Sequence, residues 1–233
     1  MKRFYKKVSV EAEDGGWRVK LDARPIKTAG GNPQILPSKP LAHAMAREWD
    51  IQGEEIDPSA FQLRDLADFA IDVVQSDNEP VIAELLPYAE TETLCYRGDD
   101  GEALCARQDA TWEPLLAAAE RRWDVHFERV SGIMHKPQPT ETLEQLKTVL
   151  LTKTDFELAA LKMLSSLAAS LVIALTALEP GADGIALWDA ANLEEDWQAE
   201  LWGEDAEAAE RRQLRQEAFL LAIRFASLAG VSA

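Results

Sequence analysis

Cysteine, histidine and long uncharged stretches are scarce in this sequence, and each scarcity excludes a class of protein. The two cysteines, Cys95 and Cys105, do not have the spacing of a metal site. No apolar signal core follows the basic residues at the start of the chain, so we expect reduced thiols in a cytosolic compartment. The longest uncharged run, Met163–Leu178, is shorter than the ~20 residues of a membrane-spanning helix, so membrane insertion is not predicted.

Motifs that carry common enzyme chemistry are also missing. There is no glycine-rich phosphate loop ending in Lys-Ser/Thr, no dinucleotide fingerprint, no paired-histidine zinc motif and no serine nucleophile elbow. The three histidines, His43, His126 and His135, are scattered along the chain. We therefore predict no catalytic residue, no metal site and no cofactor.

Basic residues are few relative to acidic ones. The 233 residues include 24 Lys and Arg against 41 Asp and Glu, which gives a formal net charge of -17. Nucleic acids and anionic membrane surfaces attract basic proteins, so this charge argues against both as partners. It favours solubility, and it suits a protein partner with a basic surface. With 47% hydrophobic residues, the chain can still bury a substantial core.

Strand patterns are confined mainly to the start of the chain. Apolar and polar residues alternate over Val8–Ala12 and again over Trp17–Leu21, with the turn signal Asp14-Gly15-Gly16 between them. This pattern predicts a β-hairpin. Ile35–Leu36 is a candidate short last strand. Alternation returns around Val125–Phe127, so we keep open that a late strand near residues 125–130 joins the same sheet.

From Ser38 onward the apolar residues recur at helical spacing. Ser38 is a candidate N-cap, and Thr154 with Glu157 has the pattern of a capping box. The helix that this box opens carries the uncharged run, and we expect it to be a buried central helix. The predicted fold class is α+β, with a small β-rich N-terminal domain over residues 1–37 and a larger all-helical domain over residues 38–233.

The densest signal lies near the end of the chain, over Asn192–Glu207. This segment holds seven carboxylates and two tryptophans around one glycine. At helical spacing, Glu194 and Gln198 fall on the same stripe as Leu187 and Leu201, so both are expected to face the core. A carboxylate on such a stripe must be paired, protonated or in contact with a partner, because burying it alone is costly.

Parts of this segment also have a purely structural explanation. Acidic residues that open a helix, as Glu204 and Asp205 would, are favoured by the helix dipole and by capping. Trp202, next to the glycine, either fixes a helix break or is an exposed interface aromatic, since tryptophan among charged residues is typical of interface hot spots. We favour a structural role for Trp202 taken alone, and partner binding for Glu194, Gln198 and Glu204 taken together.

A series of short motifs runs in order along nearly the whole chain. The motifs are Arg3-Phe4-Tyr5-Lys6, Val19-Lys20-Leu21-Asp22-Ala23-Arg24-Pro25-Ile26-Lys27-Thr28, Leu41-Ala42, Glu48-Trp49-Asp50-Ile51-Gln52, Leu66-Ala67 with Ala70-Ile71-Asp72, Leu94-Cys95-Tyr96-Arg97, Gln108 with Trp112-Glu113-Pro114-Leu115-Leu116, Glu194-Glu195 with Gln198, and Trp202-Gly203-Glu204-Asp205-Ala206-Glu207-Ala208. In this order they resemble one family, the assembly chaperones that handle the alpha subunit of the catalytic sector of F-type ATP synthase in mitochondria and related bacteria.

The resemblance implies a two-part fold and a non-enzymatic role. That role is to bind the unassembled alpha subunit and to cover a surface that the beta subunit later takes. The resemblance also marks the acidic C-terminal segment and the Glu-Trp-x-x-Gln helix as functionally sensitive. The partner-binding residues that it implies are Trp49, Gln52, Glu194, Glu195, Gln198, Trp202, Glu204, Asp205 and Glu207. We expect a free monomer in the bacterial cytoplasm, because no transit sequence is evident, with the mitochondrial matrix as the alternative.

Two other functions stay open. The chain could be an enzyme that uses Glu194 and Glu195 as acid and base in a cleft between its two parts, although adjacent residues on a helix point about 100° apart. It could also be a structural subunit of a larger complex, in which case a large apolar patch should be exposed in the isolated chain.

Overall fold

The structure is a computed structural model that describes residues 1–132, 134–203 and 205–230. By the contacts within it, the chain divides into two units. The first unit comprises Met1–Asn78, Thr154–Ala160 and the described residues from Arg224 onward, and the second comprises Glu79–Lys153 and Leu161–Ile223. The sequence-based division between residues 37 and 38 follows the change from strands to helices and stays a prediction.

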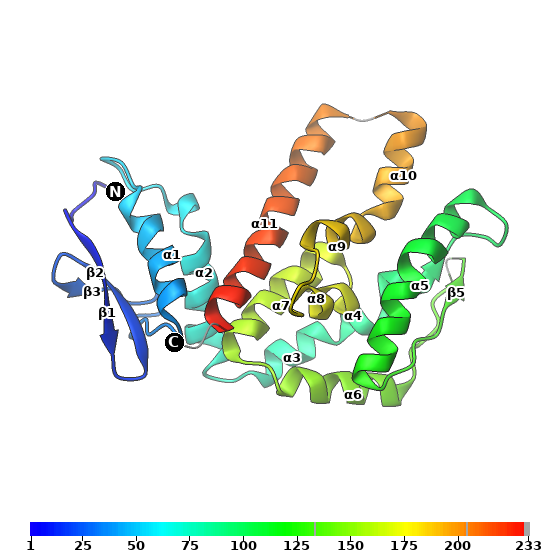
Figure 1. Ribbon diagram of the computed structural model, residues 1–233, viewed down its shortest axis with the longest axis horizontal. Helices are drawn as coiled ribbons and strands as arrows, with labels where there is room; N and C mark the ends of the chain where they lie inside the picture. The colour runs from blue at the N-terminus through cyan, green and yellow to red at the C-terminus, as the bar shows by residue number, and fades with distance from the viewer. Residues whose placement is uncertain (133, 204, 231–233) are drawn as a thin grey trace. The chain divides into compact units, whose positions relative to one another are not determined.

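A three-stranded antiparallel sheet opens the first unit (Figure 1). Glu13 pairs with Gly16, so Asp14 and Gly15 form a two-residue turn. Gly15 has a φ of 85°, which glycine adopts without strain. The predicted β-hairpin is therefore confirmed. The strands, in their order across the sheet, are β1 (Val8–Glu13), β2 (Gly16–Leu21) and β3 (Arg24–Pro25).

The first helix packs on this sheet, and side chains cap the helices of this unit. Ser38 is the N-cap of the first helix, and its Oγ accepts a hydrogen bond from the Leu41 N–H at 3.1 Å. The next long helix has no side-chain cap of its own, and the carboxylate of Glu48 accepts the N–H groups of Leu63 and Arg64 at 2.7 and 3.1 Å. The helical elements are α1 (Lys39–Asp50), which packs on β1 and β2, a 3-10 turn (Pro58–Ala60), α2 (Gln62–Phe69) and a π-helical turn (Ala70–Val74).

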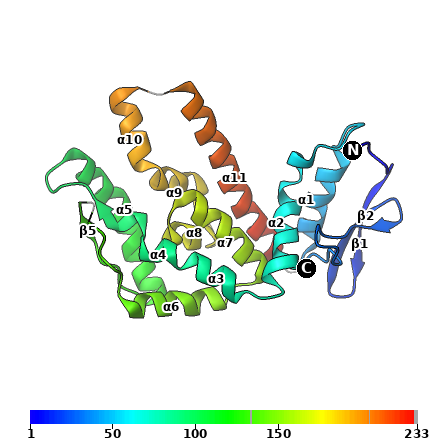
Figure 2. The same ribbon diagram turned by 180° about the vertical axis from the view of Figure 1, so that it is seen from behind.

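The second unit is mostly helical, and a short buried helix, α8, lies among its other helices (Figure 2). α8 contacts α4, α5 and α9. Two longer helices, α7 and α11, contribute residues to both units. The elements are α3 (Glu79–Leu85), α4 (Pro87–Glu90), a 3-10 turn (Thr93–Cys95), β4 (Tyr96–Arg97), α5 (Ala103–Trp123), β5 (Val130–Ser131), α6 (Thr140–Leu151), α7 (Asp155–Ala168), α8 (Leu171–Ala177), α9 (Gly184–Ala191), α10 (Leu193–Trp202) and α11 (Ala206–Gly230).

The uncharged run Met163–Leu178 forms two helices, so the prediction of one central helix is wrong. α7 ends at Ala168, and Ala169 takes a left-handed φ of 49°. Ser170 then caps α8, because its Oγ accepts the N–H of Ile173 at 2.9 Å. The apolar character of the run hid this break, since hydrophobicity is continuous across it. Burial of the run, by contrast, was predicted correctly for α8.

The late strand does not join the N-terminal sheet. β5 pairs in parallel with β4, with Tyr96 opposite Val130, in a separate two-stranded sheet. Phe127 lies in no strand although its side chain is buried, and its N–H donates to Glu120 Oε1 of α5 at 2.9 Å. The alternation near residues 125–127 therefore reflects burial against α5 and not strand pairing.

The fold class is α+β, as predicted. The capping box at the start of α7 is also present, because Thr154 N donates to Glu157 Oε2 at 2.8 Å and Glu157 N donates to Thr154 Oγ1 at 3.2 Å. Within the described residues, no helix combines the length and the apolar character that crossing a bilayer requires.

Candidate functional site

The segment that the sequence singles out lies on a helical hairpin of the second unit. We use the word hairpin for α10 together with α11 as far as Ile223. Figures 1 and 2 show the two helices extending away from the helices around α8. Asn192 separates α9 from α10, because its φ of -106° and ψ of 17° are not helical. Gly203 ends α10 with a φ of 91°, a conformation that favours glycine.

α10 is poorly buried. Among its residues only Leu193 is buried, and Glu194, Glu195 and Gln198 are all exposed. The prediction that Glu194 and Gln198 face the core is therefore wrong. The reason is the interruption at Asn192, after which α10 does not continue the helical register of α9.

Arg107 of α5 holds α10 from one side. Its Nη1 and Nη2 donate to the two carboxylate oxygens of Glu200 at 2.6 and 2.8 Å, and its guanidinium lies 5.5 Å from the ring centroid of Trp197. The hydrogen bond from Arg107 lowers the pKa of Glu200. Gln108 Nε2 donates to Glu194 Oε1 at 2.6 Å. Polar contacts thus provide the main attachment of α10 to α5.

Arginines of α11 hold α10 from the other side. Arg212 Nη2 lies 2.7 Å from Asp196 Oδ2 and 3.3 Å from Asp189 Oδ1 of α9. Arg215 Nη1 lies 3.8 Å from Glu195 Oε1. Glu194 and Glu195 are therefore directed at different elements, so they do not face each other as an acid–base pair would.

Open grooves flank α10 on both sides. The groove toward α11 has a volume of about 520 Å³, and its lining includes Gln198, Trp202 and Asp205. The groove toward α5 and α9 has a volume of about 680 Å³, and its lining includes Arg107 and Glu200. Two grooves along one weakly buried helix leave a large part of that helix available for contact.

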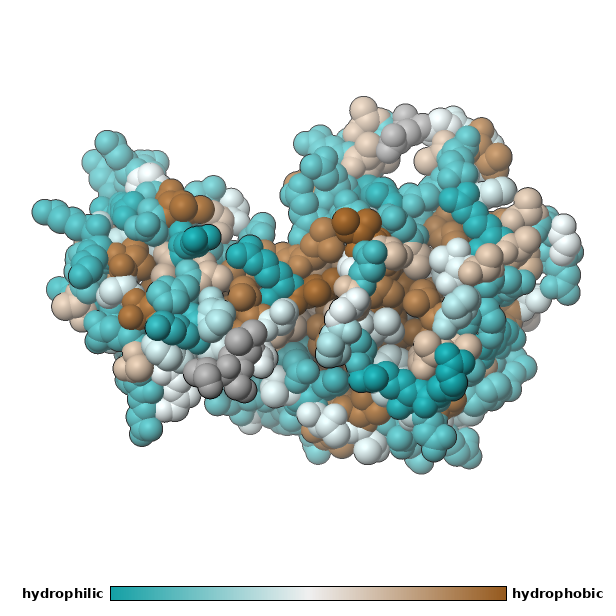
Figure 3. All heavy atoms as spheres, in the orientation of Figure 1, coloured by the Kyte–Doolittle hydropathy of each residue, from teal (hydrophilic) through white to brown (hydrophobic). Residues whose placement is uncertain are grey.

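The far end of the hairpin combines apolar side chains with carboxylates. Trp202 is 78% exposed and Leu201 is 57% exposed, and hydrophobic atoms stand at the surface at the far end of α10 in Figure 3. Asp205 and Glu207 are also exposed, and Asp205 Oδ1 accepts the Glu207 N–H at 3.3 Å, as expected at a helix start. Glu204 lies outside the described residues.

This arrangement fits protein binding better than core packing. An indole that is mostly exposed does not fix a helix break by burial, whereas it offers a large apolar surface to a partner. The carboxylates beside it favour a partner with basic residues. Asp205 is compatible with both helix capping and partner binding, because its carboxylate accepts an N–H at the start of α11 and is exposed.

Trp49 and Gln52, the other two candidate residues, lie inside the first unit. Trp49 is 6% exposed, and its ring lies 5.6 Å from that of Tyr5 and 4.4 Å from that of Phe61. Gln52 Nε2 donates to the Glu48 carbonyl at 2.9 Å, and Gln52 Oε1 accepts the Asp57 N–H at 2.8 Å. Both side chains therefore hold α1 and the loop that follows it in place.

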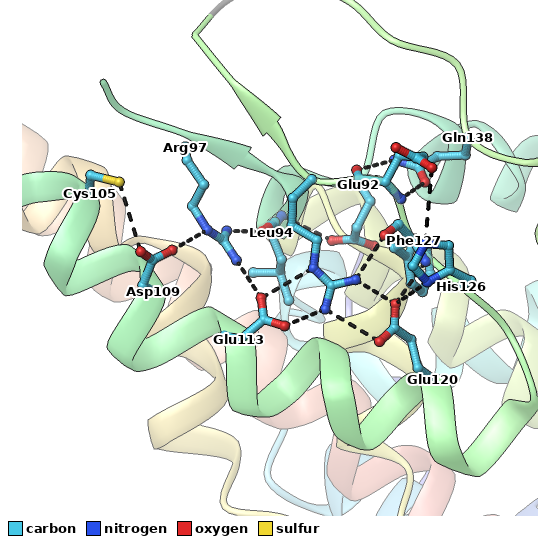
Figure 4. A network of polar contacts seen from close by, with 12 residues as sticks. Glu92, Leu94, Arg97, Cys105, Asp109, Glu113, Glu120, His126, Phe127 and Gln138 are labelled. Carbon is cyan, nitrogen blue, oxygen red and sulfur yellow. Dashed lines mark hydrogen bonds and ion pairs between the residues drawn. The ribbon is translucent and has the colours of Figure 1, made fainter. Parts of the chain in front are cut away.

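Sequence reasoning missed the arginines that organise the second unit. Figure 4 shows acidic side chains of α5 directed at arginines. Arg97 Nε donates to Asp109 Oδ1 at 3.0 Å, Arg129 Nη2 donates to Glu113 Oε1 at 2.6 Å, and Arg129 also binds Glu120. These carboxylates are engaged by arginines, so the network fixes the β4 and β5 segments on α5 rather than presenting free acid–base groups.

The aspartates of α2 and of the π-helical turn bind a loop of the protein or lie at its surface. Asp72 accepts hydrogen bonds from Thr28 Oγ1, Gly30 N and Asn32 Nδ2 at 2.6, 2.7 and 2.8 Å. Asp68 accepts bonds from Ala29 N and Gln34 Nε2 at 3.0 and 2.5 Å, and Asp65 is exposed. Among the described residues, no group of His, Cys, Asp and Glu side chains is suited to hold a metal ion.

The two cysteines are buried and not bonded to each other. Burial raises the pKa of the Cys95 thiol to about 12, which argues against an activated nucleophile at neutral pH. Cys95 is therefore a buried structural residue.

Comparisons with known proteins agree along most of the chain. The family described as ATP12 chaperone protein matches residues 2–120. The Schizosaccharomyces pombe protein "Protein atp12, mitochondrial" is 26% identical over 231 residues, which cover 93% of this chain and 79% of that protein. The crystal structure of Atp12 from Paracoccus denitrificans is 35% identical, covers 98% of each chain and has a TM-score of 0.92. The Agrobacterium tumefaciens protein Atu1473 is 38% identical, covers 97% of this chain and 85% of its own, and has a TM-score of 0.91.

Proposed function

The chain belongs to the ATP12 chaperone family, whose role is ATP synthase assembly, and from this premise we propose that it binds the unassembled alpha subunit of F-type ATP synthase. It masks an interface of that subunit until the beta subunit replaces it. A free subunit exposes surface that promotes self-association, and a bound chaperone prevents this. The role requires no catalysis.

The observation that carries the proposal is the exposed indole of Trp202 at the end of the acidic, weakly buried helix α10. Trp202 acts as the apolar anchor, and Asp205 and Glu207 attract basic groups of the client. Glu194, Glu195, Gln198 and Glu204 complete the proposed contact surface. Trp49 and Gln52 contribute indirectly, because they are buried and shape the first unit.

Displacement by the beta subunit follows from the kind of contact proposed. A surface held by one aromatic anchor and a rim of exposed charges binds with moderate strength, since exposed ion pairs each contribute about 0–1 kcal/mol. The beta subunit forms a permanent interface with the alpha subunit and therefore outcompetes it. We place this exchange in the bacterial cytoplasm, between a monomeric chaperone and one client; a mitochondrial relative keeps the matrix as the alternative.

A titration of purified alpha subunit tests the proposal. We expect saturable binding that beta subunit displaces, and Trp202→Ala should weaken it by about 2 kcal/mol, roughly 30-fold in Kd. The Tm should not change, because Trp202 is largely exposed. Leu151→Ala is the matched control, since Leu151 is 50% exposed and lies at the end of α6, outside the hairpin and the candidate residues.

The same titration separates the rival functions. Binding that beta subunit does not displace would indicate a permanent structural subunit. A failure of the alpha subunit to bind would contradict the proposal. Equal binding by the Trp202→Ala and Leu151→Ala variants would show that the hairpin is not part of the client contact. An enzyme using Glu194 and Glu195 is not favoured, because these side chains contact Gln108 and Arg215 respectively.

A further inference from the structure

A third groove lies in the first unit, between α1 and the last described turns of α11. Its volume is about 360 Å³, within the range of pockets that accept small ligands or single side chains. Val8 and Leu228 give it apolar lining, and His43, Arg47 and Arg224 place nitrogen-bearing side chains along it. Nothing in the proposed client contact uses these residues.

The walls of this groove are fixed by contacts within the first unit. Ser38 Oγ donates to the Leu228 carbonyl at 2.5 Å, which ties the start of α1 to the end of α11. Phe156 stacks on Phe225 with ring centroids 5.8 Å apart. The groove therefore lies between secondary-structure elements that are held in position, rather than between mobile loops.

The two arginines of the groove are unneutralised. Among the described residues, neither Arg47 nor Arg224 forms an ion pair or a side-chain hydrogen bond. Both are exposed. Among the described lining residues Asp50 is the one carboxylate, and its Oδ1 lies 3.9 Å from Nη2 of a third arginine, Arg3. In a chain with 41 acidic and 24 basic residues, two guanidinium groups in one groove without a carboxylate partner leave a local positive site.

The groove between α10 and α11 is different, although it also contains arginines. Arg211, Arg212 and Arg215 line it, and each is paired with a carboxylate of the protein. Its cations are therefore already satisfied. The segment that forms most of the first unit is also less acidic than the rest of the chain. Residues 1–78 hold 11 basic and 13 acidic residues, whereas residues 79–233 hold 13 basic and 28 acidic residues.

We infer that the groove between α1 and the end of α11 binds an acidic peptide segment, in which a carboxylate stands next to an apolar side chain. Arginine binds carboxylates through paired hydrogen bonds, so Arg47 and Arg224 recognise the charge, and Val8 and Leu228 accept the apolar neighbour. The segment belongs to the client. In this respect the inference rests on the proposed function, and it adds a second contact of opposite charge to that of the hairpin.

A peptide titration tests the groove without the client. The probe is a labelled, end-blocked ten-residue peptide of alternating leucine and glutamate, with a leucine and glutamine peptide as its neutral counterpart. Fluorescence anisotropy measures both against the protein and against Arg47→Glu with Arg224→Glu. The matched control is Arg24→Glu with Arg121→Glu, two exposed arginines outside the groove, which changes the net charge by the same amount.

We expect the acidic peptide to bind the unchanged protein and the control variant with similar Kd. The groove variant should bind the acidic peptide at least about tenfold more weakly than the unchanged protein does. The unchanged protein should bind the neutral peptide about as weakly as the groove variant binds the acidic one. Added salt should weaken binding of the acidic peptide to the unchanged protein. Equal binding by the groove and control variants, or no saturable binding of the acidic peptide, overturns the inference. A circular dichroism melt of each variant confirms that it is folded.

The client titration then separates this inference from the proposed function. Weaker binding of alpha subunit by the groove variant than by the control variant supports both the proposed client and the groove as its second contact. Equal binding by the two variants retains the alpha subunit as client and overturns the groove as its second contact. Binding of the acidic peptide in the groove, with no binding of alpha subunit by the unchanged protein, contradicts the proposed client and leaves the peptide site standing.

Discussion

α8 and α10 are short helices of the same unit, and their surroundings are opposite. α8 has seven residues, and all but Thr176 are buried. α10 has ten residues, of which only Leu193 is buried. The start of α8 is capped by Ser170 Oγ and by the carboxylate of Glu92, whereas α10 has no side-chain cap.

This difference indicates how the second unit divides its tasks. Burial of apolar side chains contributes the larger share of stability, so α8 carries much of the stability of this unit. α10 is held mainly by exposed or half-exposed ion pairs, each of which contributes little. Elements with few buried contacts open at low free-energy cost, and binding surfaces are drawn from such elements.

The largest effect should come from a cavity in α8. Ile173→Ala removes a fully buried side chain and should lower the free energy of unfolding by roughly 2–5 kcal/mol. Urea denaturation measures it. Leu201→Ala on α10 is the comparison, and because Leu201 is 57% exposed its effect should stay within about 0.5 kcal/mol. Similar losses for both would remove the distinction between the helices.

A pH-dependent effect of intermediate size should arise at Glu92. Burial raises its pKa from 4.5 to about 7, and hydrogen bonds from Ser170, Val172 and Leu94 only partly offset this. Because the folded state favours the protonated carboxyl, the stabilisation is complete below pH 4.5 and is lost as pH rises through about 7.

Glu92→Gln removes this titration. Between pH 5 and pH 8 the unchanged protein should lose about 2–3 kcal/mol more stability than the variant, as measured by urea denaturation at several pH values. Glu141→Gln, at an exposed position of α6, is the control and should keep the original pH dependence. If the free energy of unfolding of the protein and of the Glu92→Gln variant changed with pH in parallel, Glu92 would not be the source of the pH dependence.

The smallest effect on global stability should come from Arg107→Ala. It removes the two hydrogen bonds to Glu200 and the contact with Trp197, and it should cost at most about 1 kcal/mol because the pair is partly exposed. Hydrogen exchange should speed up in α10 and not in α8. Unchanged exchange in α10 would mean that Arg107 does not hold it. Arg121→Ala, elsewhere on α5, controls for the charge.

Local features of the fold were predictable from sequence, and contacts distant in sequence were not. The turn at Asp14-Gly15, the Ser38 cap and the Thr154–Glu157 box depend on residues a few positions apart, and all three are present. The pairing of β4 with β5 joins segments more than thirty residues apart, and no periodicity reveals it. Ala169 breaks a continuous apolar run through its backbone conformation, which composition does not encode.

The candidate site shows the same limit. Its position in the acidic segment was visible from composition, but the directions of Glu194 and Gln198 depended on the break at Asn192. Arg107 and Glu200 are 93 residues apart, so no spacing rule could connect them. The resemblance marked Trp49 and Gln52 as sensitive, and the structure places both in the interior.

The glycine-rich loop over residues 28–34 has the composition of a spacer, yet Asp68 and Asp72 bind it at five points. A side chain at Gly30 would place its Cβ 2.7 Å from Asp72 Oδ2. The loop is therefore a poor place to insert an epitope tag or a fluorophore. The turn at Gly15, where an added Cβ meets no atom within 4 Å, has room for such an insertion, provided that it begins with a residue tolerant of positive φ.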